Sequence, residues 1–149
     1  MKYQVINSFP ELGLKTALIF LDWVSKNPNG VISLPTGKTP EYFIKWTQKI
    51  LNEWGTAEIE ALLVKNGVTF QEKPDLSGLH FVQIDDFYPI DPEQHNSFFS
   101  YVNEYYIKGF GLDLDKALLI NTEEISLPDK GVKDIFPDLK IDLTLRYRS

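Results

Sequence analysis

A candidate anion-binding run joins an apolar segment to a segment with helical periodicity: Pro35-Thr36-Gly37-Lys38-Thr39. The N-terminus of a helix has unpaired backbone N–H groups and the positive end of the helix dipole. Gly37 has no Cβ that would keep a ligand from the backbone, while two threonine hydroxyls and the Lys38 amine can add donors. The run therefore predicts a site for a phosphate or a sugar oxygen. Its spacing is not that of the nucleotide P-loop or the three-glycine dinucleotide motif, and a plain strand-to-helix turn stays the alternative.

Two adjacent acids, Asp85 and Asp86, end a second apolar segment. In open parallel sheets, ligands bind beyond the carboxyl ends of the strands. If both apolar segments are strands that end at one edge, Asp85 and the 35–39 turn face one pocket. A carboxylate in that place could act as a general base. The alternative is that one aspartate caps the following turn and the other is solvated.

An acidic, proline-rich loop follows the two acids and contains Asp91 and His95. Together with the acids, these two side chains could bind a divalent ion. Their spacing matches no recognised metal-binding loop, so we predict no metal site. His95 could instead donate to a substrate oxygen, or lie on the surface beside a helix cap formed by Asn96 or Ser97. His80, inside the second apolar segment, is expected to be packed or at a sheet edge.

Hydrophobic periodicity and turn residues predict the elements that position these side chains. Their order is helix, strand, helix, helix, strand, helix, strand, which indicates an α/β domain with a mostly parallel sheet and right-handed crossovers. The predicted helices are 10–27 with Ser8 in a capping box, one that starts at Pro40 with Thr39 as N-cap, 56–66, and one capped by Asn96 or Ser97; the predicted strands are 31–34, 79–84 and 117–120.

Composition limits the classes of protein to which the chain can belong. A length of 149 residues allows one domain, and 43% hydrophobic with 24% charged residues is typical of a soluble globular protein. The net charge of -6 argues against nucleic acid as a partner, because phosphate backbones need a basic patch. The absence of cysteine excludes disulfides, thiolate nucleophiles and cysteine-bound metals. With no apolar run of membrane-spanning length, we expect no membrane partner and a soluble, cytoplasmic protein.

The C-terminal part of the chain has a different pattern. It contains isolated prolines and alternating charges, and 141–147 alternates as a possible strand with one wet face. A doubly wound sheet that ended there would expose one edge and much of one face. We therefore favour a truncated chain or partial gene product over a small complete domain with a strand tail. We divide the chain into an N-terminal part, 1–121, and 122–149, an extended tail or the start of a missing part.

Three segments, taken in order, resemble the glucosamine-6-phosphate deaminase family of sugar-phosphate isomerases and deaminases. They are 31–40, an apolar strand with a proline-threonine-glycine turn; 81–88, a strand that ends in an aspartate, a second acid and an aromatic; and 92–99, where a serine and aromatics open a helix. Asn121 after an apolar run resembles a further strand end of the family. The resemblance covers roughly 12–121 and implies the Rossmann-like fold, with a mostly parallel three-layer sheet, that these enzymes share with 6-phosphogluconolactonases and ribose-5-phosphate isomerases.

The resemblance also implies an activity and its residues. In the deaminases, the turn that matches 35–39 binds the phosphate of a small sugar-phosphate substrate. The acid that matches Asp85 moves a proton between C1 and C2, and Asp86 matches a neighbouring acid with a less defined role. The family converts glucosamine 6-phosphate to fructose 6-phosphate and ammonia without a cofactor, and a homo-oligomer is possible.

The chain departs from the family in two respects. The second catalytic cluster, an aspartate-glycine-histidine motif with a later glutamate, and the phosphate-binding lysine further on have no match after Asn121. Lys38 stands where the family often has glycine or serine. We therefore expect this chain to be inactive alone. A 6-phosphogluconolactonase-like hydrolase ranks lower, because Phe87 replaces its usual arginine. A non-catalytic sugar-phosphate sensor and a structural or assembly domain are competing hypotheses.

Overall fold

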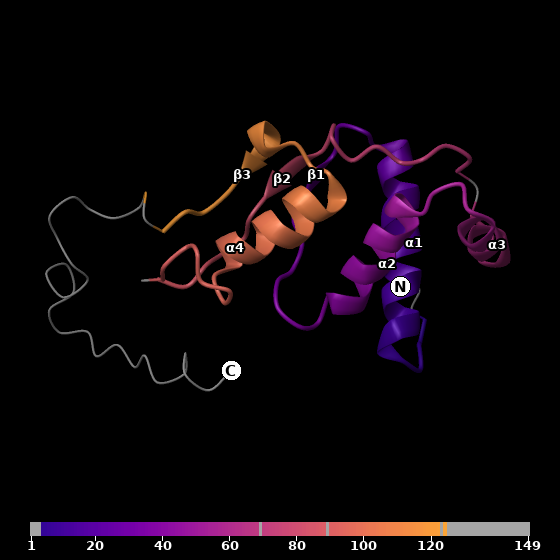
Figure 1. The fold of residues 1–149 in the computed structure, drawn as a ribbon, viewed down its shortest axis with the longest axis horizontal. Coiled ribbons are helices and arrows are strands. Elements are labelled where there is room, and N and C mark those ends of the chain that lie inside the picture. Colours follow the sequence, from indigo (N-terminus) through magenta and orange to yellow (C-terminus); the bar gives the residue numbers. More distant parts are fainter. Residues whose placement is uncertain (1–3, 69, 89, 123, 125–149) are drawn as a thin grey trace, which may run out of the picture.

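The computed structural model describes residues 4–68, 70–88, 90–122 and 124 (Figure 1). Within them, helices and short strands follow the predicted order. The elements are α1 (Phe9–Lys26), β1 (Val31–Ile32), α2 (Glu41–Asn52), α3 (Ala57–Lys65), β2 (His80–Val82), α4 (Phe98–Val102), the π-helix η1 (Asn103–Lys108), the 3-10 helix η2 (Leu114–Lys116) and β3 (Ala117–Leu118). The predicted strand at 141–147, and nearly all of the predicted 122–149 tail, lie outside the described residues.

The three strands form one open sheet in the order β1-β2-β3, and both pairings are parallel. Ile32 pairs with Phe81, which pairs in turn with Ala117. Helices α2 and α3 lie between β1 and β2 in the chain, and α4 and η1 lie between β2 and β3, as parallel neighbours require. The predicted α/β class with a parallel sheet is confirmed.

The strands end at residues 32, 82 and 118, each two residues before its predicted limit. Beyond β2, the buried side chain of Gln83 makes hydrogen bonds to backbone groups in place of regular strand pairing. Its Oε1 accepts from the backbone N–H of Ile120 at 3.0 Å, and its Nε2 donates to the carbonyl of Asp85 at 2.9 Å. A side-chain amide can satisfy backbone groups where two chains diverge, so the extended path continues without regular pairing.

Two helices begin with a side-chain cap: Ser8 was predicted as one, whereas Thr56 was predicted as the first residue of its helix and is its cap instead. The Ser8 hydroxyl accepts from the N–H of Glu11 at the start of α1, and the Thr56 hydroxyl accepts from the N–H of Ile59 at the start of α3, both at 3.4 Å. Each cap satisfies one of the N–H groups that a helix start leaves unpaired. None of the helices within the described residues has the length and apolarity needed to cross a membrane.

The prediction that Thr39 caps α2 is wrong. The N-cap is Pro40, no side chain caps this helix, and the helix itself begins at Glu41. The N–H of Glu41 donates to the carbonyl of Lys38 at 3.3 Å, which closes a turn just before the helix. Because this turn occupies residues 38–41, the Thr39 side chain is exposed instead of lying against the helix start.

One face of the sheet carries the core. Phe81 is 1% exposed and contacts the ring of Tyr106, with 5.8 Å between ring centroids. Phe20 of α1, Phe43 of α2 and Phe110 after η1 meet in a cluster with centroids 5.4–6.1 Å apart. Because Phe110 follows η1, this cluster joins the α1–α2 pair to the helices after β2, and residues of both belong to one hydrophobic core.

The opposite face of the sheet is open in the described part of the chain. Val31 and Leu118 are 67% and 69% exposed, and Ile84, on the same side beyond β2, is 67% exposed. His80 is exposed on this face of the central strand, so the prediction that it is packed or at an edge is wrong. The Rossmann-like arrangement of the described residues is thus an incomplete one, with one layer of helices on one side of the sheet.

Candidate functional site

The turn at 35–39 and the acids after β2 lie at one edge of the sheet. Because β1 and β2 are parallel neighbours, their carboxyl ends meet at the same edge. The hydroxyl of Ser33, just after β1, donates to the carbonyl of Val82 at 2.6 Å and ties the two strand ends together. The structure therefore brings together the two segments that sequence analysis placed on one edge, and not on opposite edges.

The turn is open to ligands on one side and held on the other. Gly37 has φ of 87°, a left-handed conformation that favours glycine, and a Cβ built there would meet nothing within 4 Å. The Tyr101 hydroxyl donates to the carbonyl of Gly37 at 2.8 Å, and the Tyr106 hydroxyl donates to the carbonyl of Pro35. Lys38 is exposed at the tip of the turn.

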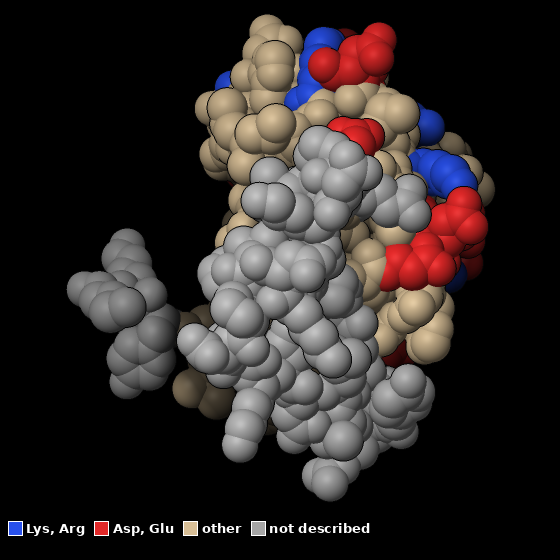
Figure 2. Space-filling model, turned by 90° about the vertical axis from the view of Figure 1, so that its left-hand side faces the viewer, with Lys and Arg blue, Asp and Glu red and all other residues tan. Residues whose placement is uncertain are grey.

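Lys38 contributes the free positive charge of this turn. It forms no ion pair among the described residues, whereas Lys45 and Lys49 of α2 pair with Glu41 at 2.5 Å and Glu58 at 2.7 Å. The hydrogen bond from Lys45 lowers the pKa of Glu41 below its ordinary value, with a smaller contribution from the charge of Lys38. Figure 2 shows acidic and basic side chains next to one another on one side of the molecule, which fits such local pairing.

Asp86 caps α4. Its Oδ1 accepts from the N–H of Phe98 at 3.0 Å and from that of Phe87 at 2.7 Å, while its Oδ2 accepts from the Ser97 hydroxyl at 3.0 Å and from the N–H of Phe99 at 2.9 Å. Four protein donors thus occupy its two oxygens. This arrangement suits a structural cap, so a catalytic role for Asp86 stays a prediction without support from its contacts.

Asp85 is placed differently from its neighbour. Its side chain is exposed and makes no hydrogen bond or ion pair within the described residues, while its backbone carbonyl is held by Gln83. The carboxylate is therefore available to a ligand at the carboxyl edge. The division of the acidic pair into one cap and one free acid matches the alternative left open by the sequence.

In the described part of the acidic loop, Asp91 and His95 form no hydrogen bond or ion pair with the 35–39 turn or with Asp85. His95 is exposed, and the Asp91 carboxylate accepts from the N–H of Glu93 at 2.9 Å in a local turn. Ser97, and not Asn96, supplies the side-chain cap of α4. Across the described ranges, no group of three or more histidine or acidic side chains is arranged to hold a metal ion.

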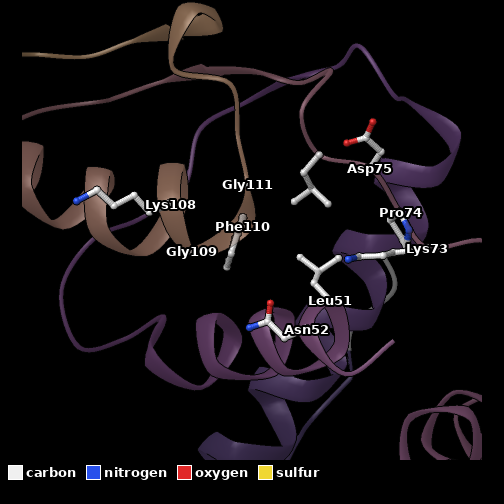
Figure 3. A pocket seen from close by; sticks show the side chains of 10 residues that line it. Leu51, Asn52, Lys73, Pro74, Asp75, Lys108, Gly109, Phe110 and Gly111 are labelled. Atoms are coloured by element: carbon white, nitrogen blue, oxygen red, sulfur yellow. The ribbon is translucent and has the colours of Figure 1, made fainter. Parts of the chain in front are cut away.

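A separate hollow of about 420 Å³ lies at the opposite end of the strands (Figure 3). Its lining includes Asn52 at the end of α2, Lys73 and Asp75 before β2, and Gly111 before β3. These residues precede the strands, so the hollow opens at the amino edge of the sheet. We place the candidate site at the carboxyl edge, because the free carboxylate, the free lysine and the open glycine turn all lie there.

Sequence analysis missed three residues of this edge: Gln83, Tyr101 and Tyr106. A glutamine at an inward-facing position of an apolar strand was a usable signal, because a buried amide needs hydrogen-bond partners. The two tyrosines gave no such signal, since their separation of five residues is not a helical repeat.

Comparison with known proteins identifies the fold through structural similarity and finds no relative by sequence. No protein-family model matches the sequence, and no characterised protein with a significantly similar sequence was found. A solved structure of a monomeric glucosamine-6-phosphate deaminase of the NagB superfamily matches with a TM-score of 0.59 and 20% identity, over 82% of this chain and 43% of that chain. The fold is Rossmann-like. This confirms the predicted fold class, and at this identity the likeness shows the fold alone.

Loss of the Asp86 cap is expected to destabilise the protein. We predict that Asp86→Ala lowers the free energy of unfolding by about 1–3 kcal/mol, because the N–H groups of α4 lose their acceptor. The matched change Asp85→Ala removes an exposed, unbonded carboxylate and should stay within about 0.5 kcal/mol of the parent. Urea unfolding followed by circular dichroism measures both. Equal effects of the two changes would contradict the cap.

The tyrosines under the turn should make stability sensitive to alkaline pH. Burial raises the pKa of Tyr106 well above its ordinary value. Burial, with a smaller contribution from the nearby Tyr105, raises the pKa of Tyr101 to about 12. A raised pKa in the folded state stabilises the fold fully below the unfolded value of about 10, and this contribution is lost as pH rises further.

The measurement is the difference in unfolding free energy between the parent and Tyr106→Phe, from about pH 9 to about pH 11. We expect a constant difference below about pH 10 that shrinks above it, because only the parent carries the ionising hydroxyl. A difference that does not change over this range would show that Tyr106 is not held in its neutral form.

Proposed function

We propose that this chain supplies the sugar-phosphate-binding half of a glucosamine-6-phosphate deaminase/isomerase-like protein of amino-sugar phosphate metabolism. One observation carries the proposal: the glycine turn with its free lysine and the free carboxylate of Asp85 follow adjacent parallel strands and share one edge. The same two features, in the same order, are those of the deaminase resemblance, and a deaminase of the NagB superfamily shares the fold.

The turn would bind the phosphate group. Backbone N–H groups of a strand-to-helix turn and the nearby helix start favour an anion, and Lys38 adds a charge that has no ion-pair partner in the described part of the chain. The exposed hydroxyl of Thr39 and the half-buried Thr36 offer further donors. Phosphate held there would fix one end of an extended sugar chain relative to Asp85.

Asp85 would act as the base in the isomerisation. Its carboxylate removes the proton from C2 of the ring-opened amino sugar and returns it to C1. A second proton passes from the amine nitrogen to O1 through solvent, so that C1 becomes a hydroxymethyl carbon and C2 becomes an imine. Water then adds to the imine, and ammonia leaves as the C2 ketone forms. The overall change is glucosamine 6-phosphate plus water to fructose 6-phosphate plus ammonia, and no cofactor enters these steps.

The described residues supply one free acid to this reaction. Opening the sugar ring needs a further acid–base group, and His95, exposed in its loop, has no hydrogen bond to this edge within the described residues. The arrangement therefore supports binding more fully than turnover. A lactonase-like function is less well supported, because Phe87 packs on Phe98, with ring centroids 4.9 Å apart, where a lactonase would need an arginine.

Calorimetric titration with glucosamine 6-phosphate, paired with an assay for ammonia release, tests the proposal. We expect the chain to bind the sugar phosphate but to release no ammonia. Lys38→Ala should weaken binding about three- to tenfold, because a charge-assisted contact is lost. Lys65→Ala, which removes an exposed lysine at the end of α3, is the control and should not change the affinity.

The outcomes separate the competing functions. Ammonia release by this chain alone would contradict the half-site assignment. Absence of binding would remove the sugar-phosphate function altogether. Binding without turnover in a longer protein that also carries the second catalytic cluster would favour a sensor over an enzyme.

A further inference from the structure

We propose that Tyr101 and Tyr106 are positioning residues that hold the 35–39 turn with its N–H groups directed at the ligand, and that the π-helix η1 is what aligns them. The inference rests on the proposed function of the turn and assigns to it one residue of α4 and one of η1, 64 and 71 positions further along the chain.

The two hydroxyls hold alternate carbonyls of the turn. Tyr106 donates to the carbonyl of Pro35, and Tyr101 donates to that of Gly37 at 2.8 Å. The two tyrosine rings contact each other in a T-shaped arrangement with centroids 6.0 Å apart. These two hydrogen bonds, here called the tethers, therefore hold the turn from one side.

These tethers orient the N–H groups of the turn. In a planar trans peptide, the N–H of a residue points opposite to the carbonyl that precedes it. With the carbonyls of Pro35 and Gly37 directed at the tyrosines, the N–H groups of Thr36 and Lys38 point away from them. Neither N–H has a hydrogen-bond partner among the described residues. Two free N–H groups that point to the same side of a turn offer donors that suit phosphate oxygens.

A regular α-helix could not align the two tyrosines. Because an α-helix turns by about 100° per residue, side chains five positions apart point roughly 140° away from each other. The i→i+5 hydrogen bond of a π-helix instead brings positions five apart onto one side. Helix α4 runs directly into the π-helix η1, and Tyr101 and Tyr106 lie on either side of that junction. Such π-helical turns are rare overall, and those that occur are frequently found at functional sites.

The core fixes the deeper of the two tethers. Tyr106 is 0% exposed, and its ring contacts Phe81 of the central strand at 5.8 Å and Phe110 at 5.2 Å between centroids. A hydroxyl on so tightly packed a ring has little freedom to move. The turn is thereby coupled to the core by Tyr106 and held at its tip by Tyr101.

Backbone order in the turn tests the positioning role directly. We would measure ¹⁵N relaxation order parameters of Thr36, Gly37 and Lys38 in the full chain and in Tyr101→Phe. The parent values should be about 0.85, those of a rigid backbone, and the variant should fall below about 0.6 at Gly37 and Lys38. Tyr105→Phe is the matched control, because that hydroxyl has no hydrogen bond in the described residues and the side chain is 43% exposed.

Affinity provides the second readout. With glucosamine 6-phosphate and with inorganic phosphate as probes, Tyr101→Phe should bind about three- to tenfold more weakly than the parent, while Tyr105→Phe should be unchanged. Tyr106→Phe should weaken binding as well, and its unfolding free energy is measured alongside to separate loss of fold from loss of positioning.

Each result decides a different claim. An ordered turn in Tyr101→Phe, or a mobile turn with unchanged affinity, would overturn the positioning role and leave the proposed function intact. If the parent binds neither probe, the proposed function fails and the ligand role of the tethers fails with it, while the order parameters still report whether the tethers hold the turn.

Discussion

The carboxylate of Asp86 is the constraint on which the candidate site depends. It lies just beyond the central strand and accepts from the Ser97 hydroxyl and from the N–H groups of Phe98 and Phe99, so it joins the end of β2 to the start of α4. The position of α4 determines where η1 begins. That in turn determines where Tyr101 and Tyr106 meet the turn after β1. The charge-assisted cap by Asp86 thus links the end of β2, through α4 and η1, to the turn that follows β1.

The same arrangement places two adjacent acids in different surroundings. Asp86 has its oxygens occupied by protein donors, whereas Asp85 presents an exposed carboxylate to the edge where the glycine turn lies. Gln83 holds the backbone of Asp85 while it also binds the chain after β3. The backbone carbonyl of Asp85 is thus held in place, while its carboxylate stays free for a ligand.

The parts of the fold that depend on local chemistry could be predicted from the sequence. Ser8 was predicted to cap the first helix, and its hydroxyl accepts from an N–H group three residues away. Alternation of helices and apolar strands predicted the parallel sheet and the shared edge. The start of α2 was misplaced by the choice of Thr39, because a turn closed by the Lys38 carbonyl precedes the helix.

The rest depended on contacts between distant segments. Nothing local to Tyr101 or Tyr106 indicates that their hydroxyls reach carbonyls 64 and 71 positions earlier in the chain. The π-helix that aligns them has no sequence signature comparable to a cap. The exposed face of Val31 and Leu118 likewise follows from which side of the sheet the helices cover, and the chain spans only 43% of the deaminase whose fold it shares.

The most direct test of the central claim is to map where glucosamine 6-phosphate binds, from the amide chemical shifts of the ¹⁵N-labelled chain during a titration. The account predicts that the largest changes fall on Thr36, Gly37 and Lys38, with a smaller change at Asp85. Changes centred instead on Asn52, Lys73 and Gly111, which line the hollow at the amino edge of the sheet, would contradict it.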